Sequence, residues 1–546
     1  MNLMDKRLLI LFIAILGIGI LPRTYKVSEI PPGINRDEGS IAYTAYSLLK
    51  TGKDEYGSFY PLSFRSFGDW KLPLYIYSTV PIVAIFGLSE FSVRLTSVLT
   101  GIGTIILTFL LTRELFKNNF VALLSMFLVA VSPWHIHLSR VESESNTAVF
   151  LTTAGVLLFL KAIKGRTWLF IPSLTLLALT YYTYAGNYIF TTLLLLVLAM
   201  LFYKSVPKKS STYIALALFV ILSLMIFSQT VFSANKTKLS GISIFSDPSV
   251  VNAKIIIPRL EHQNNIFARL THNRPAFAVE KITQNYLNSF SLNFLFVSGG
   301  GNKAHNIQNF GNMYLTESVF LFLGFLYVLL RRNKKEYQII LLWFLIAPIA
   351  SSITKDAPHT NRMFAAFPIL PIITAFGFYS FREYLKKFPL KEIVVSFIGL
   401  IFLFNTVLYL DRYFIHFPKN EAQNWGLGYK NLYLTLEEKY PDKSVIMANP
   451  SHSPYIYLLF YSRYDPTRFS QNVIRYPITK DGFVHVKSYD RFEFRDIVWK
   501  KDIERPNALL VANPLEVPSL YLTESFSKSY IRLPNGETMF VIIETR

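Results

Sequence analysis

Two adjacent carboxylates open a mildly amphipathic stretch just beyond the first apolar run. Asp37 and Glu38 lie in "GINRDEGSIAYTAYSLLKTG", residues 33–52. Carboxylates near lipid are costly and tend to be functional, and such a pair could supply a general base or ligate a divalent ion. Acidic residues also complement the macrodipole at a helix N-terminus. The local sequence leaves both explanations open.

Further titratable residues follow, each near an end of an apolar run. Glu144 adds a third carboxylate, and the basic or potentially basic residues are Lys71, Arg140, His359 and Arg362. Any one of the basic side chains could simply extend to lipid headgroups. Several that converge are better explained by an anionic ligand such as a phosphate.

A base beside cationic groups suits sugar transfer from a lipid-linked phosphosugar. An acceptor hydroxyl would lose its proton to the carboxylate while it attacks the anomeric carbon, and the lipid phosphate would leave. Phosphate is already a good leaving group, whereas glycoside hydrolysis usually needs two carboxylates because its leaving group must be protonated. One base with cationic stabilisation is therefore sufficient for this chemistry.

The composition places these residues in a polytopic membrane protein with some soluble mass. The chain has 546 residues, of which 51% are hydrophobic and 16% charged, a balance typical of that class. Cysteine is absent, which excludes disulfides and cysteine-ligated metals. The net charge of +20 resides largely in short basic clusters between apolar runs, as in cytoplasmic loops. We therefore expect no nucleic-acid partner.

About eleven apolar runs are long enough, or nearly so, to cross a bilayer. We place them at 8–22, 94–112, 119–137, 146–163, 168–184, 187–203, 213–232, 314–330, 337–353, 362–381 and 391–410. The first run lacks a small-residue cleavage site, so we interpret it as a retained span. Run 72–88 is short and contains two prolines. If it spanned, the basic clusters that follow would lie outside, so we expect it to lie in the interface or to re-enter.

This topology places the N-terminus inside and the C-terminus outside, and it gathers the titratable residues on the outer face. The span interiors carry almost no ionisable residues, which argues against an ion-coupled transporter. Residues 1–412 form the predicted transmembrane domain. Residues 413–546 form a predicted soluble, extracytoplasmic α/β domain, with helix-like "KNLYLTLEEKY" and strand-like "SVIMAN", "ALLVAN" and "MFVIIE".

These motifs resemble the membrane glycosyltransferases of the GT-C fold, specifically the protein O-mannosyltransferases and the bacterial lipid A aminoarabinose transferases. The resemblance covers roughly residues 1–410. Its most specific piece is "RDEGSIAYTAYSLLKTG" followed by "FGDWKLPLYIY", where the family carries Asp-Glu after the first span and a Lys-Pro-Pro-Leu-Tyr element. Leu72 replaces the first of these two prolines. The resemblance implies that Asp37 is the catalytic base with Glu38 beside it, and that Lys71 contacts the lipid phosphate.

Two further motifs extend the resemblance. "SPWHIHLSRVESESNTAVF" is similar to the family's Ser-Arg element with an acidic residue after it, which implies roles for Arg140 and for Glu144, with Glu142 as an alternative to Glu144. "APHTNRMFAAFPIL" resembles a Pro-His…Arg element, which implies that His359 and Arg362 face the lipid phosphate. The family also has two juxtamembrane helices in its first outer loop. The resemblance thus favours catalysis over helix capping for Asp37 and Glu38.

The sequence therefore predicts a polytopic α-helical GT-C glycosyltransferase in the membrane, expected to be a bacterial plasma membrane. It would move a sugar from a polyprenyl-phosphate donor to a hydroxyl of a protein, glycan or lipid at the outer face, with inversion. No cofactor is required by the motifs, although a divalent metal ion could assist. Two alternatives stay open: oligosaccharide transfer from a lipid pyrophosphate, and a non-enzymatic transporter or flippase of lipid-linked sugars.

Overall fold

The chain divides into two compact units. A computed structural model describes residues 6–230, 242–479, 482–523 and 525–545. Unit 1 comprises Met1–Tyr25, Ser97–Ser139 and Ser143–Leu410, and unit 2 comprises Lys26–Thr96, Arg140–Glu142 and Asp411–Arg546. Unit 2 takes up the chain again at Asp411, next to the predicted boundary at 412/413, and it also contains residues 26–96.

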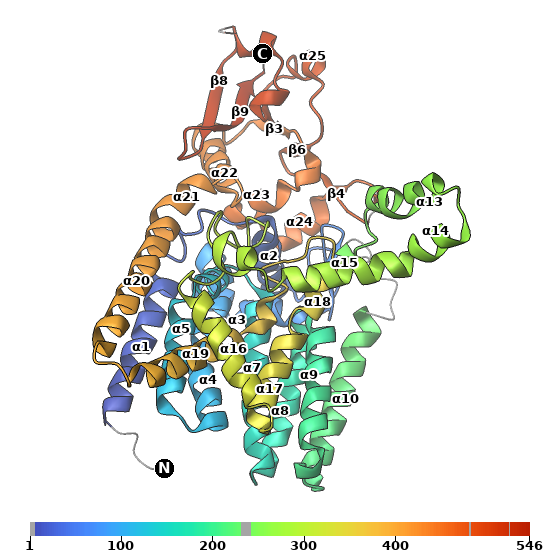
Figure 1. Ribbon diagram of the computed structural model, residues 1–546. Helices are drawn as coiled ribbons and strands as arrows, with labels where there is room; N and C mark the ends of the chain where they lie inside the picture. The colour runs from blue at the N-terminus through green and yellow to red at the C-terminus, as the bar shows by residue number, and fades with distance from the viewer. Residues whose placement is uncertain (1–5, 231–241, 480–481, 524, 546) are drawn as a thin grey trace. The chain divides into compact units, whose positions relative to one another are not determined.

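Long apolar helices run through unit 1 (Figure 1). Within the described residues, six helices are long and apolar enough to cross a membrane: Lys6–Thr24, Glu90–Phe116, Glu144–Ile163, Asn187–Ser205, Ser210–Thr230 and Lys391–Asn420. They contain α1 (Lys6–Thr24), α4 (Glu90–Phe116), α7 (Glu144–Ile163), α9 (Asn187–Phe202), α10 (Ser210–Thr230) and α20 (Lys391–Asp411). The protein is thus a helical membrane protein, as its composition predicts.

The remaining predicted apolar runs form shorter helices. These are α5 (Asn119–Val131), α8 (Phe170–Leu179), α16 (Glu317–Leu330), α17 (Lys335–Ile346) and α19 (Ile369–Leu385). Residues 231–232, at the end of one predicted run, and residues 233–241 of the long predicted loop lie outside the described residues. The chain segments that connect the apolar helices form further helices. These are α6 (Pro133–Leu138), α12 (Pro248–Val251), α13 (Ile257–Glu261), α14 (Ile266–Thr271), α15 (Arg274–Asn288) and α18 (Ile349–Ser352).

Helices α16 and α19 cross at two glycines. A Cβ atom added to Gly324 would overlap the backbone carbonyl of Ile373, and one added to Gly377 would overlap the carbonyl of Phe320. Small residues at a crossing allow two helix backbones to touch, and this is a common way to pack helices in a membrane. The two backbones are therefore in direct contact at this point.

Unit 2 contains the outer loop that the family resemblance singles out. This loop forms α2 (Arg36–Thr51), a hairpin of β1 (Phe64–Ser66) and β2 (Asp69–Lys71), and α3 (Pro73–Phe86). At 14 residues, α3 is as long as α16, so its length alone does not decide whether it spans. Its Tyr75, Ile76 and Val83 belong to the hydrophobic core of unit 2. These contacts support the prediction that run 72–88 does not span.

A seven-stranded mixed sheet forms the other part of unit 2. The strand order is β4-β5-β6-β3-β7-β9-β8, with β3 parallel to both β6 and β7 and the other neighbours antiparallel. The strands are β3 (Ser444–Met447), β4 (Ile474–Arg475), β5 (Val486–Tyr489), β6 (Phe492–Phe494), β7 (Ala508–Ala512), β8 (Lys528–Arg532) and β9 (Thr538–Glu544). All five residues of β7 are buried, as expected for a strand covered on both faces.

Five helices accompany this sheet in unit 2. They are α21 (Phe417–Asn420), α22 (Leu427–Lys439), α23 (Tyr455–Ser462), α24 (Pro466–Asn472) and α25 (Trp499–Asp502). Residues of α2, α3, α22, α23 and the sheet share one hydrophobic core. The outer loop 26–96 and the C-terminal residues therefore fold together. The prediction of a C-terminal domain with mixed helix and strand is confirmed.

Candidate active site

Helix α2 begins with a capping box that contains Glu38. The side chain of Asn35 accepts a hydrogen bond from the Glu38 backbone N–H at 2.8 Å, and the Asn35 N–H donates to Glu38 Oε2 at 3.4 Å. The two bonds satisfy amide groups that have no partner within the helix. Glu38 therefore caps helix α2, which is one of the two roles that the sequence leaves open for it.

Glu38 also forms a fully buried ion pair with Arg94, a residue that the sequence analysis missed. Arg94 Nε donates to Glu38 Oε1 at 3.1 Å, and Arg94 Nη2 donates to Glu38 Oε2 at 3.0 Å. The backbone N–H of Glu142 donates to Glu38 Oε1 at 3.0 Å. Neither side chain of the pair has measurable exposure. The bidentate pair fixes α2 to the start of α4.

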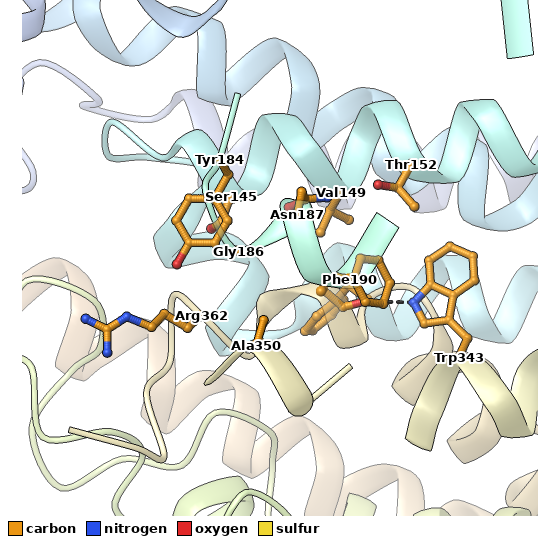
Figure 2. A pocket seen from close by; sticks show the side chains of 12 residues that line it. Ser145, Val149, Thr152, Tyr184, Gly186, Asn187, Phe190, Trp343, Ala350 and Arg362 are labelled. Carbon is orange, nitrogen blue, oxygen red and sulfur yellow. Dashed lines mark hydrogen bonds between the residues drawn. The ribbon is translucent and has the colours of Figure 1, made fainter. Parts of the chain in front are cut away.

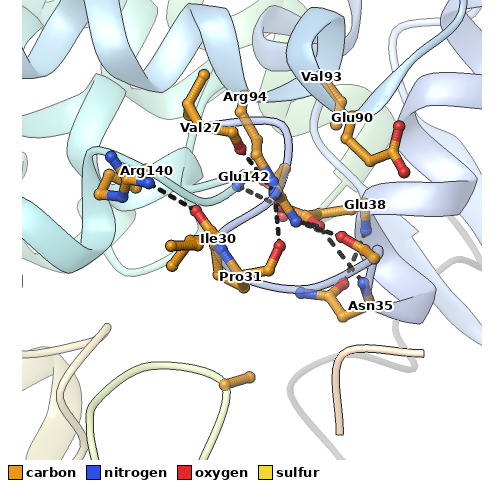
Figure 3. Close-up of polar contacts among 12 residues, drawn as sticks. Val27, Ile30, Pro31, Asn35, Glu38, Glu90, Val93, Arg94, Arg140 and Glu142 are labelled. Carbon is orange, nitrogen blue, oxygen red and sulfur yellow. Dashed lines mark hydrogen bonds and ion pairs between the residues drawn. The ribbon is translucent and has the colours of Figure 1, made fainter. Parts of the chain in front are cut away.

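Arg94 anchors the preceding loop as well (Figure 3). Its Nη1 donates to the carbonyls of Val27 and Pro31 at 2.8 and 3.0 Å, and its Nη2 donates to the carbonyl of Gly33 at 2.5 Å. One guanidinium thus holds both the loop and the N-terminal turn of α2. The available signal in the sequence was a charged residue one turn after Glu90 at the edge of an apolar run.

Asp37 differs from its neighbour because its carboxylate reaches the surface of unit 2. Its side chain is 49% exposed, and its Oδ1 lies 3.1 Å from Nζ of Lys71, whose side chain is 11% exposed. Lys71 ends β2, one residue before Leu72, the N-cap of α3. The structure therefore brings together two predicted site residues from different elements. Of the two carboxylates, only Asp37 is accessible to a substrate.

Arg140 is buried in unit 2 among backbone carbonyls and aromatic rings. Its Nη2 donates to the carbonyls of Ile30 and Lys26 at 2.8 and 3.3 Å. Its guanidinium lies 4.9 Å from the ring centroid of Phe414 and 5.5 Å from that of Tyr413. Such contacts stabilise a buried guanidinium. They give Arg140 a part in holding loop 26–30.

In unit 1, Arg362 and His359 share a carboxylate that the sequence analysis did not single out. Arg362 Nη1 forms an ion pair with Asp356 and donates to Thr354 Oγ1 at 2.7 Å. His359 Nε2 lies 3.7 Å from Asp356 Oδ2. Burial, and then the charge of Arg362, lower the pKa of His359 to about 4, and Asp356 opposes them. At neutral pH, His359 is therefore a neutral hydrogen-bonding group rather than a cation.

Arg362 also lines a small cavity of about 10 Å³ in unit 1, with room for about one water molecule. Tyr184, Ser145 and Arg362 lie toward one side of the group, and Phe190 and Trp343 toward the other (Figure 2). The end with Phe190 and Trp343 is more apolar, although Thr152 lies beside Trp343 there. Ser145 donates a hydrogen bond to the side chain of Asn361, next to Arg362.

Glu144 is the first residue of α7, where its charge complements the helix macrodipole. It is 8% exposed. Both Glu144 and Arg362 act electrostatically on Tyr184, which places these two predicted residues around one tyrosine. No group of three or more His, Asp or Glu that could hold a metal ion occurs among the residues that the structure describes.

Comparisons with known proteins bear on this arrangement. Residues 54–237 match the sequence model of the family described as dolichyl-phosphate-mannose-protein mannosyltransferase. This segment contains Lys71, Arg94, Arg140 and Glu144. No match occurs among the curated proteins.

Solved structures with similar folds cover nearly all of the chain. ArnT from Cupriavidus metallidurans bound to undecaprenyl phosphate has a TM-score of 0.54 and 11% identity, over 99% of this chain and 98% of that one. The apo form of the same ArnT has a TM-score of 0.54 and 12% identity, over 98% of this chain and 97% of that one. The Archaeoglobus fulgidus oligosaccharyltransferase tethered to an acceptor peptide has a TM-score of 0.51 and 13% identity, over 98% of this chain and 74% of that one.

Residues 54–237 are thus similar to the protein mannosyltransferase family, and the chain as a whole has an ArnT-like fold, with apolar helices and a mixed-sheet unit.

Proposed function

We propose that this chain transfers one sugar from a polyprenyl-phosphate donor to an acceptor hydroxyl, with inversion, and that Asp37 is the general base. The observation that carries the proposal is the half-exposed Asp37 carboxylate, 3.1 Å from Lys71. The description of the matched family names a dolichyl-phosphate sugar, and ArnT was solved with undecaprenyl phosphate. Both support a lipid-phosphate donor.

The proposed reaction is a single displacement at the anomeric carbon. The acceptor oxygen forms a bond to this carbon while Asp37 takes the hydroxyl proton. The bond between the carbon and the phosphate oxygen breaks, and its electron pair stays on the phosphate. Lys71 stabilises the charge that accumulates there. Because the acceptor attacks opposite the leaving phosphate, the configuration inverts.

Glu38 and Arg140 act as positioning residues in this proposal. Glu38 is fully engaged by its contacts with Arg94 and Glu142, so it orients α2 and hence Asp37. Arg140 holds the loop that leads into α2. The carboxylate that the resemblance placed beside the base therefore acts through the backbone that carries Asp37.

In unit 1, Arg362, His359 and Asp356 form a polar cluster whose guanidinium is suited to an anionic headgroup. The cavity beside Arg362 has room for about one water molecule and not for an isoprenoid chain. His359 contributes a neutral N–H group. The negative charge of Glu144 opposes the effect of Arg362 on Tyr184. The acceptor is a hydroxyl of a protein, glycan or lipid. Oligosaccharide transfer is the second candidate, favoured by the likeness to the archaeal oligosaccharyltransferase.

The test is a transfer assay in proteoliposomes with labelled polyprenyl-phosphate sugar. Asp37→Asn removes the base but keeps the side chain's size, so turnover should fall by roughly 10²–10⁴ while donor binding persists. Lys71→Ala and Arg362→Lys should each lower turnover by roughly 10²–10³, because the charge or the guanidinium fork on the phosphate is lost.

Glu29→Gln is the matched control, because Glu29 is an exposed carboxylate in the loop that leads into α2. It lies outside the helix, which begins at Arg36, so this variant should retain normal turnover. Near-normal turnover in Asp37→Asn would return Asp37 to the role of a helix-terminal charge. Release of labelled whole glycans from a lipid pyrophosphate would favour the second candidate, and movement of donor without transfer would favour a flippase.

A further inference from the structure

Residues 248–292 of unit 1, here called the surface arm, expose an unusual amount of apolar surface. The arm consists of α12 to α15 with a π-helical turn, Asn252–Ile256. In α14, the side chains of Ile266, Phe267 and Leu270 are 70%, 75% and 67% exposed. A soluble surface rarely gathers so many apolar side chains without a partner.

Helix α15 has a buried side and an exposed side. Phe277 and Asn285 are buried against the protein, and Asn285 Nδ2 donates to the carbonyls of Ser352 and Thr354 at 2.9 and 3.0 Å. Val279 and Leu287, here called the apolar face of α15, are 68% and 62% exposed. Asn288 is exposed too, and the 3.6-residue period places it on the opposite side of the helix from Val279.

The apolar face of α15 continues onto α17, one of the shorter apolar helices of the same unit. Phe290, one turn after Leu287, packs on Phe344 of α17 with ring centroids 4.7 Å apart. Tyr286 donates to the carbonyl of Leu345 at 2.9 Å. Helix α15 lies across, rather than along, the long helices α9 and α10 (Figure 1). This is the arrangement of a helix at the edge of a bilayer.

The arm is also basic. It carries five basic residues, Lys254, Arg259, Arg269, Arg274 and Lys281, and two acidic residues, Glu261 and Glu280. Arg274 borders an open groove together with Phe245 and Pro275. Basic residues beside exposed apolar side chains are typical of helices that lie in a membrane interface, where they contact anionic headgroups.

We propose that the surface arm is an interfacial membrane-binding element whose exposed apolar side chains insert into one leaflet while its basic residues contact anionic lipid headgroups. The occupant of the apolar face is thus lipid, and α15 lies in the plane of the interface. The hydrogen bonds from Asn285 to Ser352 and Thr354 attach this element to the loop that carries Arg362.

The test measures the depth of single side chains in the full-length protein. Because the chain has no cysteine, Val279→Cys, Leu287→Cys and Phe267→Cys can each carry one spin label. Asn288→Cys, on the side of α15 opposite Val279, is the matched control. The protein is reconstituted in phosphatidylcholine vesicles, with or without phosphatidylglycerol. Accessibility to oxygen and to a water-soluble nickel chelate is then measured by EPR.

We expect labels at 279, 287 and 267 to favour oxygen over the nickel chelate by several-fold relative to the label at 288. The difference should increase with phosphatidylglycerol, and it should lose this dependence when Arg269, Arg274 and Lys281 are replaced by glutamine. Equal accessibility to the nickel chelate at all four positions would mean that the arm lies in water. Protection from both reagents at 279 and 287 would mean that protein covers this face. Either result overturns the proposal.

Discussion

Glu38 and Asp37 are neighbours in the sequence, yet they have different surroundings. Glu38 is fully buried against Arg94, whereas Asp37 is half-exposed beside Lys71. Removing one partner of a buried ion pair leaves an uncompensated charge and is strongly destabilising, whereas changing an exposed carboxylate costs little. Mutation of Glu38 should therefore lower the stability of the protein much more than mutation of Asp37.

Glu38→Gln should lower the free energy of unfolding by about 3–5 kcal/mol, because Arg94 would be left buried without its counter-charge. Asp37→Asn should change it by less than about 1 kcal/mol. Thermal unfolding of the purified protein in detergent measures both. Equal stability of the two variants would contradict the structural role of Glu38.

Glu55, in the loop after α2, is a second buried carboxylate of unit 2. Tyr455 donates a hydrogen bond to its Oε2 at 3.2 Å. Burial raises the pKa of Glu55 to about 7, although Arg475 and Tyr455 oppose it and Asp54 adds to it. Its ordinary pKa is 4.5. The carboxyl group of Glu55 therefore binds its proton more tightly in the folded protein than in the unfolded chain.

The stability that this proton provides is fully present below pH 4.5 and is lost as the pH rises through 7. The difference amounts to roughly 3 kcal/mol. Glu55→Gln is neutral at every pH, so the variant should match the natural protein at about pH 4 and exceed its stability at about pH 8. Thermal unfolding at both pH values measures this, with Glu29→Gln as an exposed control. If the stability of Glu55→Gln and of the natural protein changed equally with pH, the raised pKa of Glu55 would be contradicted.

At the scale of elements, α15 and the loop 354–362 are joined by a chain of hydrogen bonds. Asn285 donates to the carbonyl of Thr354, and Thr354 Oγ1 accepts from Arg362. Asn285 has no measurable exposure, so its loss leaves two buried carbonyls without their donor. Helix α15 should therefore influence Arg362 without touching it.

Asn285→Ala should lower the free energy of unfolding by about 1–3 kcal/mol and should also reduce turnover in the transfer assay. Asn288→Ala, a change at an exposed position on the same helix, is the control and should alter neither. Normal turnover in Asn285→Ala, despite reduced stability, would limit the contact to a structural role.

Sequence patterns predicted those elements whose signals are local. Long apolar runs predicted the helices of unit 1, and short apolar runs such as "ALLVAN" predicted β7 because a buried strand is almost wholly apolar. Arg94 was missed because its partner Glu38 lies 56 residues away, and no local pattern links them. The common core of residues 26–96 and the C-terminal sheet was missed for the same reason, since it depends on tertiary packing.

At the scale of the whole molecule, the basic clusters between the helices predict the orientation in the membrane. We expect a membrane-impermeant maleimide to label cysteines placed at Ser58, Ser89, Lys355 and Lys500 from outside. Cysteines at Lys117, Lys164, Lys208 and Lys334 should react only after the membrane is opened, because basic loops stay in the cytoplasm.

The cysteine at Ser89 carries the decisive comparison. Together with Ser58 it flanks the hairpin and α3, so labelling of both from the same side means that α3 does not span. Labelling at 58 from outside and at 89 only from inside would make α3 a span. That result would reverse the orientation of every later loop.

The crossing of α16 and α19 determines how this part of the molecule can move. Because the backbones touch at Gly324 and Gly377, sliding one helix along the other would drive a carbonyl into the neighbouring side chains. Aromatic pairs join the same two helices on either side of the glycines, Phe320 with Phe378 and Tyr327 with Phe376, and these oppose rotation about the contact. The two helices should therefore move as one rigid body. Since α19 begins seven residues after Arg362, any shift of this body would also move the backbone that follows Arg362.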